Sequence, residues 1–245
     1  MRRSVLVPAL LALSLFATAC AGPGGGLGLP SCAPDAGPIQ NPPAVHVGDV
    51  WVYRENDDYT GIDRGVFRLE VTGVTASEIQ ARITLPSGRD FAESYDPQWG
   101  WIAVSNRNWD WLSRLAPGSG TIAFSPAFDA TPFPLRAGQT WSNHVVAIDP
   151  VSQARVPIDI DGKARCWEKV SVPAGEFVAL RIERTAYLQD LEWYRSQTTL
   201  RQVEWYVPEA NRSVMIWRDS YYYDYRQRGP SMLILGDRLR WEWVR

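Results

Sequence analysis

The chain has 245 residues, 45% hydrophobic and 21% charged, which suits one all-β domain of about 200 residues or two small fused ones. Lys and Arg total 25 against 27 Asp and Glu, and neither sign gathers into a run, so the sequence excludes a charged surface for nucleic acid. The 12 Trp and 10 Tyr favour β-strands, whose half-buried surfaces accommodate aromatic side chains well.

The first residues form an export signal. Met1-Arg2-Arg3 is a short positive start, residues 5–16 are apolar apart from Ser14, and small residues precede Cys20. The apolar run is short for a bilayer span, so a retained membrane helix is the weaker interpretation. An ordinary secretory signal with an incidental cysteine is a second alternative.

Ala17-Thr18-Ala19-Cys20 resembles the lipobox of bacterial lipoproteins, with Ala17 standing where Leu is commonest. The resemblance implies removal of a signal peptide, residues 1–19, and acylation of Cys20, palmitate included, which attaches the protein to a membrane. Several acyl chains at about 0.8 kcal/mol per buried CH₂ make such attachment close to permanent. Ala21 follows in place of Asp, which implies the periplasmic face of the outer membrane if the cell has two membranes.

Residues 20–44 are predicted to be a lipid-anchored linker. Half of residues 21–44 are Gly or Pro, with no apolar period for a helix or strand, and a chain of this length reaches on the order of 27 Å. If Cys20 is acylated, Cys32 and Cys166 remain, and an exported protein meets an oxidising compartment. The sequence leaves open whether these two form a disulfide or whether Cys166 is a buried small apolar residue.

Residues 45–245 show apolar alternation with period two, which is typical of strands with one wet face. The alternating apolar sets are Phe67, Leu69 and Val71, then Ile79, Ala81 and Ile83, then Val178, Leu180 and Ile182. We therefore predict an all-β fold, an antiparallel, strongly curved sheet or half-open barrel or sandwich, with few helices. Only residues 106–115 have a helical pattern.

Two related halves are predicted, at about residues 45–133 and 134–245. Val47-Gly48-Asp49-Val50-Trp51-Val52-Tyr53 is echoed by Ala137-Gly138-Gln139-Thr140-Trp141-Ser142. The same three kinds of landmark follow each stretch in the same order. In the first half they are Gly73, Pro86-Ser87-Gly88 and Tyr95-Asp96-Pro97-Gln98, and in the second they are Gly162, Pro173-Ala174-Gly175 and Tyr206-Val207-Pro208-Glu209. Because Gln139 replaces Asp49 while Gly and Trp recur, the echo is interpreted as a turn and a core anchor rather than a catalytic signature.

Residues 170–182, which contain Val172-Pro173-Ala174-Gly175-Glu176-Phe177, also resemble a motif of uncharacterised β-rich periplasmic domains of bacteria, often preceded by a Gly-x-x-Trp strand. The resemblance covers about half of the folded region and implies the fold class. It implies no activity.

No catalytic, metal or cofactor site is predicted. His46 and His144 are the only histidines, neither has a second ligand at metal spacing, and no nucleophile elbow occurs. Two carboxylate groups, Asp57-Asp58 with Asp63 and Asp159 with Asp161, lie in polar turns where solvated charge is the usual state. Residues 56–61 partly match a calcium loop, but Phe67 occupies its twelfth position in place of Glu.

The aromatic rows are the remaining functional candidates. Trp99, Trp101, Tyr221, Tyr223 and Trp243 are the set that would line a ligand cavity, and the alternative is that they fill the core and cross-strand pairs. The sequence favours a lipid-anchored envelope protein acting as a non-enzymatic interaction module with envelope proteins. A carrier of a lipid or other hydrophobic ligand is the second hypothesis, and an enzyme acting on envelope polysaccharide is the third.

Overall fold

The computed structural model describes residues 38, 40–105, 120–189, 194–226 and 231–245. Within these ranges lie twelve strands and one short 3₁₀ helix: β1 (Val50–Asp57), β2 (Ile62–Val74), β3 (Ile79–Thr84), β4 (Asp90–Tyr95), β5 (Trp101–Ser105), β6 (Thr121–Phe128), β7 (Thr140–Ile148), β8 (Arg155–Val172), β9 (Gly175–Leu188), β10 (Thr198–Val207), η1 (Pro208–Ala210), β11 (Arg212–Asp224) and β12 (Met232–Trp243). The helical pattern at residues 106–115 lies outside the described residues.

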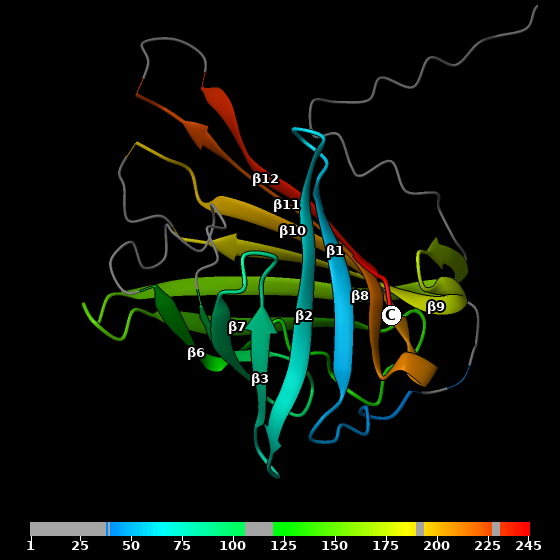
Figure 1. Cartoon of the computed structure of the whole chain (residues 1–245). Helices are drawn as coiled ribbons and strands as arrows, with labels where there is room; N and C mark the ends of the chain where they lie inside the picture. Colours follow the sequence, from blue (N-terminus) through cyan, green and yellow to red (C-terminus); the bar gives the residue numbers. More distant parts are fainter. Residues whose placement is uncertain (1–37, 39, 106–119, 190–193, 227–230) are drawn as a thin grey trace, which may run out of the picture. The chain divides into compact units, whose positions relative to one another are not determined.

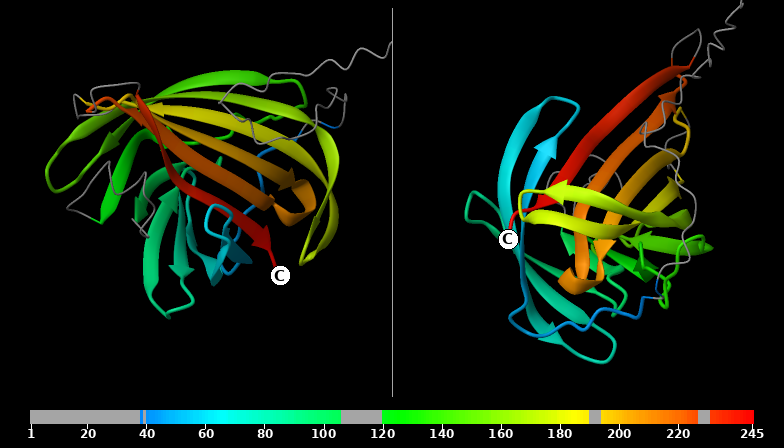
Figure 2. Two further views of the ribbon diagram at one scale, coloured as in Figure 1. Left: turned by 90° about the horizontal axis from the view of Figure 1, so that it is seen from above. Right: turned by 90° about the vertical axis from the view of Figure 1, so that its right-hand side faces the viewer.

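The strands form a closed antiparallel barrel in which each strand pairs with its neighbours in sequence (Figure 1). The ring closes where β1 pairs with β12, with Tyr53 opposite Trp243 and Asp57 opposite Leu239. Figure 2 shows the succession of strands from two further sides, from cyan β1 and β2 to red β12. The predicted all-β, antiparallel and strongly curved fold is therefore confirmed, and the sheet is closed rather than half open.

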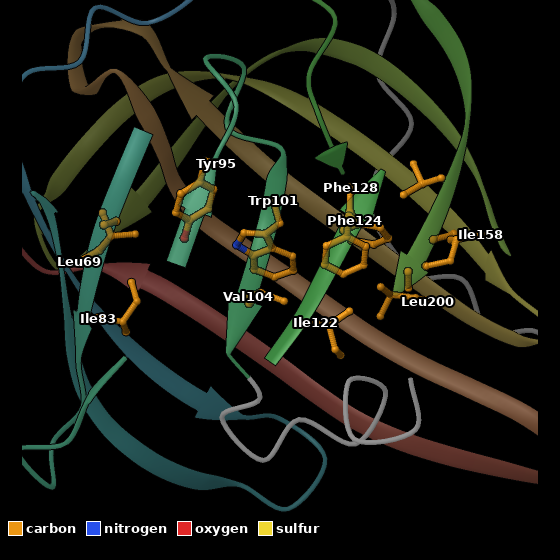
Figure 3. Close-up of a cluster of buried hydrophobic side chains, with 14 of the residues drawn as sticks. Leu69, Ile83, Tyr95, Trp101, Val104, Ile122, Phe124, Phe128, Ile158 and Leu200 are labelled. Atoms are coloured by element: carbon orange, nitrogen blue, oxygen red, sulfur yellow. The ribbon is translucent and has the colours of Figure 1, made fainter. Parts of the chain in front are cut away.

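The predicted alternation is the basis of the core. Phe67, Leu69 and Val71 on β2 and Ile79, Ala81 and Ile83 on β3 are all buried. Figure 3 shows Leu69 and Ile83 projecting into one cluster with Tyr95, Trp101 and Phe128. Along β9 the prediction holds for Leu180 and Ile182, but Val178 is 56% exposed while Ala179 is buried. Val178 is the fourth residue of β9, close to the turn that joins it to β8, and the alternation along β9 becomes regular only after it.

The two echoed stretches build the same backbone turn. Gly48 and Gly138 both have positive φ, at 94° and 85°, a conformation that glycine adopts without steric cost. The N–H of Gly48 donates to the carbonyl of Val71 at 2.9 Å, and the N–H of Gly138 donates to the carbonyl of Ala164 at 2.8 Å. Each turn thus fixes the first strand of its half against the second.

Asp49 and Gln139 occupy corresponding positions in the two turns and accept the same kind of hydrogen bond. A side-chain oxygen of Asp49 accepts the backbone N–H of His46 at 2.8 Å, and that of Gln139 accepts the N–H of Arg136 at 3.1 Å. Because either a carboxylate or an amide oxygen accepts this bond, the position constrains the turn and does not require a charge.

The pairing corrects part of the landmark alignment. Trp51 lies opposite Leu69, and Trp141 lies opposite Gly162, so Gly162 corresponds to Leu69 rather than to Gly73. The two Pro-x-Gly turns also fall at different hairpins, β3–β4 and β8–β9, whereas the Tyr-x-Pro turns follow β4 and β10. Duplication of the two halves stays a prediction.

Gly162 is required by the Trp141 side chain. A Cβ at position 162 would lie 2.1 Å from Cε2 of the indole. Trp141 packs against a buried cluster that includes Leu135, Leu180 and Tyr206. The glycine therefore makes room for a large side chain on the neighbouring strand.

We expect Gly162→Ala to destabilise the protein by about 1–3 kcal/mol, because the added methyl group displaces the indole. Trp141→Ala removes the obstacle, so the double variant should lose less stability than the sum of the two single changes. Urea unfolding of the four proteins in this cycle measures the coupling, and strictly additive effects would contradict the proposed contact.

Candidate functional site

A cavity lies where the β4–β5 turn and the segment after β6 meet strands β10, β11 and β12. Its volume is about 70 Å³, and it is partly open to solvent. Aromatic side chains form much of its wall: Tyr95, Trp99, Trp101, Phe133, Tyr206 and Trp241. Charged side chains line it as well: Asp129, Glu204, Arg212 and Arg218.

The size of the cavity limits what it holds. Pockets for drug-sized ligands typically measure about 300–1,000 Å³, and a cavity needs about 10–15 Å³ to hold one water molecule. At about 70 Å³, this cavity accommodates one small chemical group and is too small for an acyl chain.

Strand alternation explains why β10 and β11 present polar groups here. Gln202, Glu204 and Tyr206 are spaced two apart on β10 and so share one face. Ile216 and Arg218 do the same on β11. A register shift between Trp205 and Tyr206 lies beside this region, where β10 pairs with β11.

Unusual backbone conformations gather around the cavity. Among the described residues, four non-glycine residues have positive φ, and two of them, Trp99 at 62° and Asp129 at 66°, line the cavity, while Asn211 at 52° directly precedes Arg212. A bulky residue in the left-handed region is strained, and such residues concentrate at binding and catalytic sites.

The turn that carries Trp99 is fixed by Asp96. One carboxylate oxygen of Asp96 accepts the N–H groups of Gln98 and Gly100 at 2.9 and 2.8 Å. Gly100 in turn lies against Ala130, where a Cβ would come within 2.7 Å of the alanine Cβ. The two segments that close this side of the cavity are therefore in direct contact.

Arg184 of β9 organises the charged groups. Its side chain is 2% exposed, its Nε lies 3.1 Å from Oδ1 of Asp129, and its Nη1 makes a close ion pair with Glu204. Its Nη2 donates to the hydroxyl of Thr131 at 2.5 Å. Two carboxylates from distant strands thus share one guanidinium, which offsets the cost of burying them.

The same network continues through neutral groups. Gln202 Nε2 donates to Asp129 at 2.5 Å, and Gln202 Oε1 accepts from Nε of Arg218 at 2.7 Å. The hydroxyl of Ser213 donates to Glu204 at 2.8 Å. Both carboxylates are therefore engaged by protein donors.

Burial raises the pKa of the Asp129 carboxyl, and the nearby Arg184 and Arg218 guanidinium groups offset that effect only in part. Glu204 raises it further by repulsion. Burial also raises the pKa of Tyr53 to about 12, so its hydroxyl stays protonated and donates to the Ser213 carbonyl at 2.6 Å.

We expect the stability advantage of the wild type over Asp129→Asn to shrink as the pH rises above the ordinary Asp pKa of about 4. Below the ordinary Asp pKa the carboxyl is protonated in both states and adds no pH-dependent cost. Above the ordinary Asp pKa the unfolded chain loses this proton while the folded protein still holds it, so the free energy of unfolding falls until the pH reaches the raised folded-state pKa. Urea unfolding across this range tests the sign, and a gap that widens with pH would contradict it.

Arg212 has a different environment. Its guanidinium lies 3.9 Å from the ring centroid of Trp99 and 5.6 Å from those of Trp51 and Tyr95. Stacking on aromatic rings stabilises a cation without neutralising it. No described carboxylate forms an ion pair with Arg212.

Of the five aromatics selected from the sequence, Trp99 and Trp101 line the cavity. On β11 the ring centroids of Tyr221 and Tyr223 lie 6.4 Å apart, and the Arg201 guanidinium carbon lies 5.3 Å from the Tyr221 centroid. The ring centroids of Trp243 and Phe177 lie 5.5 Å apart. These three are not among the residues that line this cavity.

The other sequence candidates lie elsewhere. His144 contacts Asp159 at 2.7 Å across an exposed part of β7 and β8, and His46 is exposed near Asp49. Asp57 pairs with Arg64 at 2.8 Å in the β1–β2 hairpin. Among the residues that the structure describes, no group of three His, Cys, Asp or Glu side chains is placed to hold a metal ion.

Cys166 is buried and forms a disulfide bond. Cys20 and Cys32 lie outside the described residues, so the pairing of Cys32 with Cys166 stays a prediction, as does acylation of Cys20. No helix in the described ranges is both long and apolar enough to span a membrane.

Sequence reasoning missed the charged residues of the cavity. One signal was available, a charged residue in a row of alternating apolar residues. Arg184 follows Leu180 and Ile182 at a spacing of two and precedes Ala186 and Leu188 at the same spacing. All five side chains are buried. Arg212 offered no such signal, because it stands at the first position of its strand.

No protein-family model and no curated protein match the sequence. The fold is similar to a solved structure from Parabacteroides distasonis, described as a candidate lipoprotein, with a TM-score of 0.50 and 18% identity over 85% of this chain and 99% of that one. A candidate exported protein of Bacteroides fragilis with a YmcC-like fold scores 0.47 at 12% identity, covering 87% and 99%. The hypothetical lipoprotein YmcC of Escherichia coli scores 0.38 at 7% identity, covering 79% and 83%. The first likeness shows a shared fold alone.

Proposed function

We propose that this protein is a lipid-anchored cell-envelope protein acting as a non-enzymatic binding module, with the cavity between the β4–β5 turn and strands β10–β12 as its binding site. The observation that carries the proposal is the gathering of aromatic walls, charged side chains and strained backbone at that cavity. Lipid attachment at Cys20 is supported by the lipobox resemblance and by the description of a neighbour in fold as a candidate lipoprotein.

The geometry favours a binding module over the two alternatives. A carrier of a whole lipid needs room for an acyl chain, which exceeds the cavity of about 70 Å³. A hydrolase acting through paired carboxylates needs them free to exchange protons, whereas Asp129 and Glu204 both contact Arg184. An envelope protein or small envelope molecule that inserts one group into the cavity fits its size.

We expect Cys20→Ala to move the protein from the membrane fraction to the soluble fraction, because the thiol that receives the acyl chains is lost. Cys32→Ala is the matched control and should remain with the membrane. Fractionation with and without detergent, and mass spectrometry of the processed N terminus, provide the readout. An unmodified N terminus in the wild type would exclude the anchor.

The proposed Cys32–Cys166 disulfide would tie the end of the linker to β8, which carries Cys166. Non-reducing digestion and peptide mapping should recover the two cysteine peptides as one linked species. Cross-links that join Cys166 to any other partner, or two free thiols, would contradict the pairing.

The binding role is tested by native mass spectrometry of protein extracted from its own membrane. A bound species should accompany the wild type and be lost from Trp99→Ala. Trp217→Ala is the control, because Trp217 is not among the residues that line the cavity, and this variant should keep the bound species. Ligand-free wild type would count against the binding module.

A further inference from the structure

We propose that Arg212 makes the cavity a site for a singly charged oxyanion, a carboxylate or phosphodiester group, which names the ligand class of the binding function proposed above and rests on it. The group is either a free small anion or the anionic part of a larger molecule.

The first argument is the state of the Arg212 donors. Nε and Nη1 are buried and donate to no oxygen among the described residues, although the Arg212 side chain also interacts with the Tyr53 hydroxyl. An unsatisfied buried N–H is costly, and more so on a charged group, because the hydrogen bond it made to water is not replaced. Tyr53 is the one described side chain with a hydrogen bond to Arg212, and aromatic rings cover the rest of the guanidinium, so a bound ligand can supply the acceptors that Nε and Nη1 lack.

The second argument is charge. Of the lining carboxylates, Asp129 and Glu204 are within ion-pair distance of Arg184, and Asp129 also lies 3.9 Å from Arg218. Arg212 has no such partner in the described chain. The cavity therefore presents a cation whose charge the protein does not neutralise, and a single negative charge complements it.

The third argument is hydrogen-bond type. Nε1 of Trp99 is also buried without an acceptor, so this wall offers unsatisfied donors from two side chains. The indoles of Trp51 and Trp241 are already engaged, by the carbonyl of Ala210 at 2.9 Å and by Glu55 at 2.9 Å. A ligand that only accepts hydrogen bonds, such as a carboxylate or phosphodiester oxygen, meets this demand, whereas an ammonium group does not.

The fourth argument is preorganisation and size. Trp99 is held in the left-handed region by the Asp96 turn, and Asn211 adopts the same region immediately before Arg212. The planar guanidinium fork matches two oxygens of one anion, and a volume of about 70 Å³ has room for one such group.

The test uses the detergent-solubilised full-length protein, with acetate and dimethyl phosphate titrated against sodium chloride at equal ionic strength. The indole N–H signal of Trp99, assigned with Trp99→Phe, should shift and saturate with the two oxyanions and not with chloride. Arg212→Gln should bind about tenfold to a hundredfold more weakly, because a charge-assisted hydrogen bond is lost. Arg212→Lys should be intermediate, since it keeps the charge without the fork.

Arg82→Gln is the matched control, because Arg82 is half-exposed on β3 and paired with Glu70 at 2.8 Å; its affinity should equal that of the wild type. Unfolding curves for each variant separate lost binding from lost folding, and the Trp99 signal of the wild type tests the site without any substitution at Arg212. No saturable shift, or equal affinity in folded Arg212→Gln, would overturn the proposal.

Monomeric dihexanoyl phosphatidylglycerol distinguishes the two sources of the anion. Binding at least tenfold tighter than dimethyl phosphate indicates the anionic group of a larger molecule, and equal binding indicates a free small anion. A neutral ligand found by native mass spectrometry would overturn the oxyanion assignment and leave the binding module standing, whereas the absence of any ligand would count against that module.

Discussion

Closure of the sheet through the pairing of β1 with β12 is the constraint on which the other features depend. In a closed antiparallel barrel every strand has two partners, so no row of backbone N–H and C=O groups is left at an edge. Closure also brings the first two strands and the last one together inside, where the ring centroids of Trp241 and Phe67 lie 6.0 Å apart and those of Tyr53 and Phe67 lie 5.5 Å apart. Since Trp241 is a wall of the cavity, the site exists only in the closed sheet.

The charged network at the centre depends on the same closure. Arg184, Asp129 and Glu204 come from β9, from the segment after β6 and from β10, and each would be costly to bury alone. The cost of burying these charges is offset when the strands bring all three side chains within contact distance. The network therefore specifies one arrangement of these segments, because a shifted register would leave a buried charge without its partner.

Aromatic side chains serve packing and the site together. Trp51 and Tyr95 belong to the main hydrophobic cluster and also lie beside the Arg212 guanidinium, and Trp99 contacts both of their rings, at 5.6 and 5.1 Å. The core thus supports the cation directly. A rigid, apolar surround strengthens any charge-assisted bond that Arg212 forms, because water competes less well there.

The sequence by itself determined the β class, the burial of Phe67, Leu69 and Val71, and the matching turns at Gly48 and Gly138, because period-two alternation and positive φ are local properties of the chain. It did not determine the cavity. Arg184 reaches Thr131 across 53 residues, so its apolar register in the sequence indicates burial but not its partners. Arg212 meets Trp99 from a different hairpin, and in the sequence it resembles an ordinary solvated charge. Only the register and closure of the barrel decided which polar residues face inward, because those depend on pairings between strands far apart in the chain.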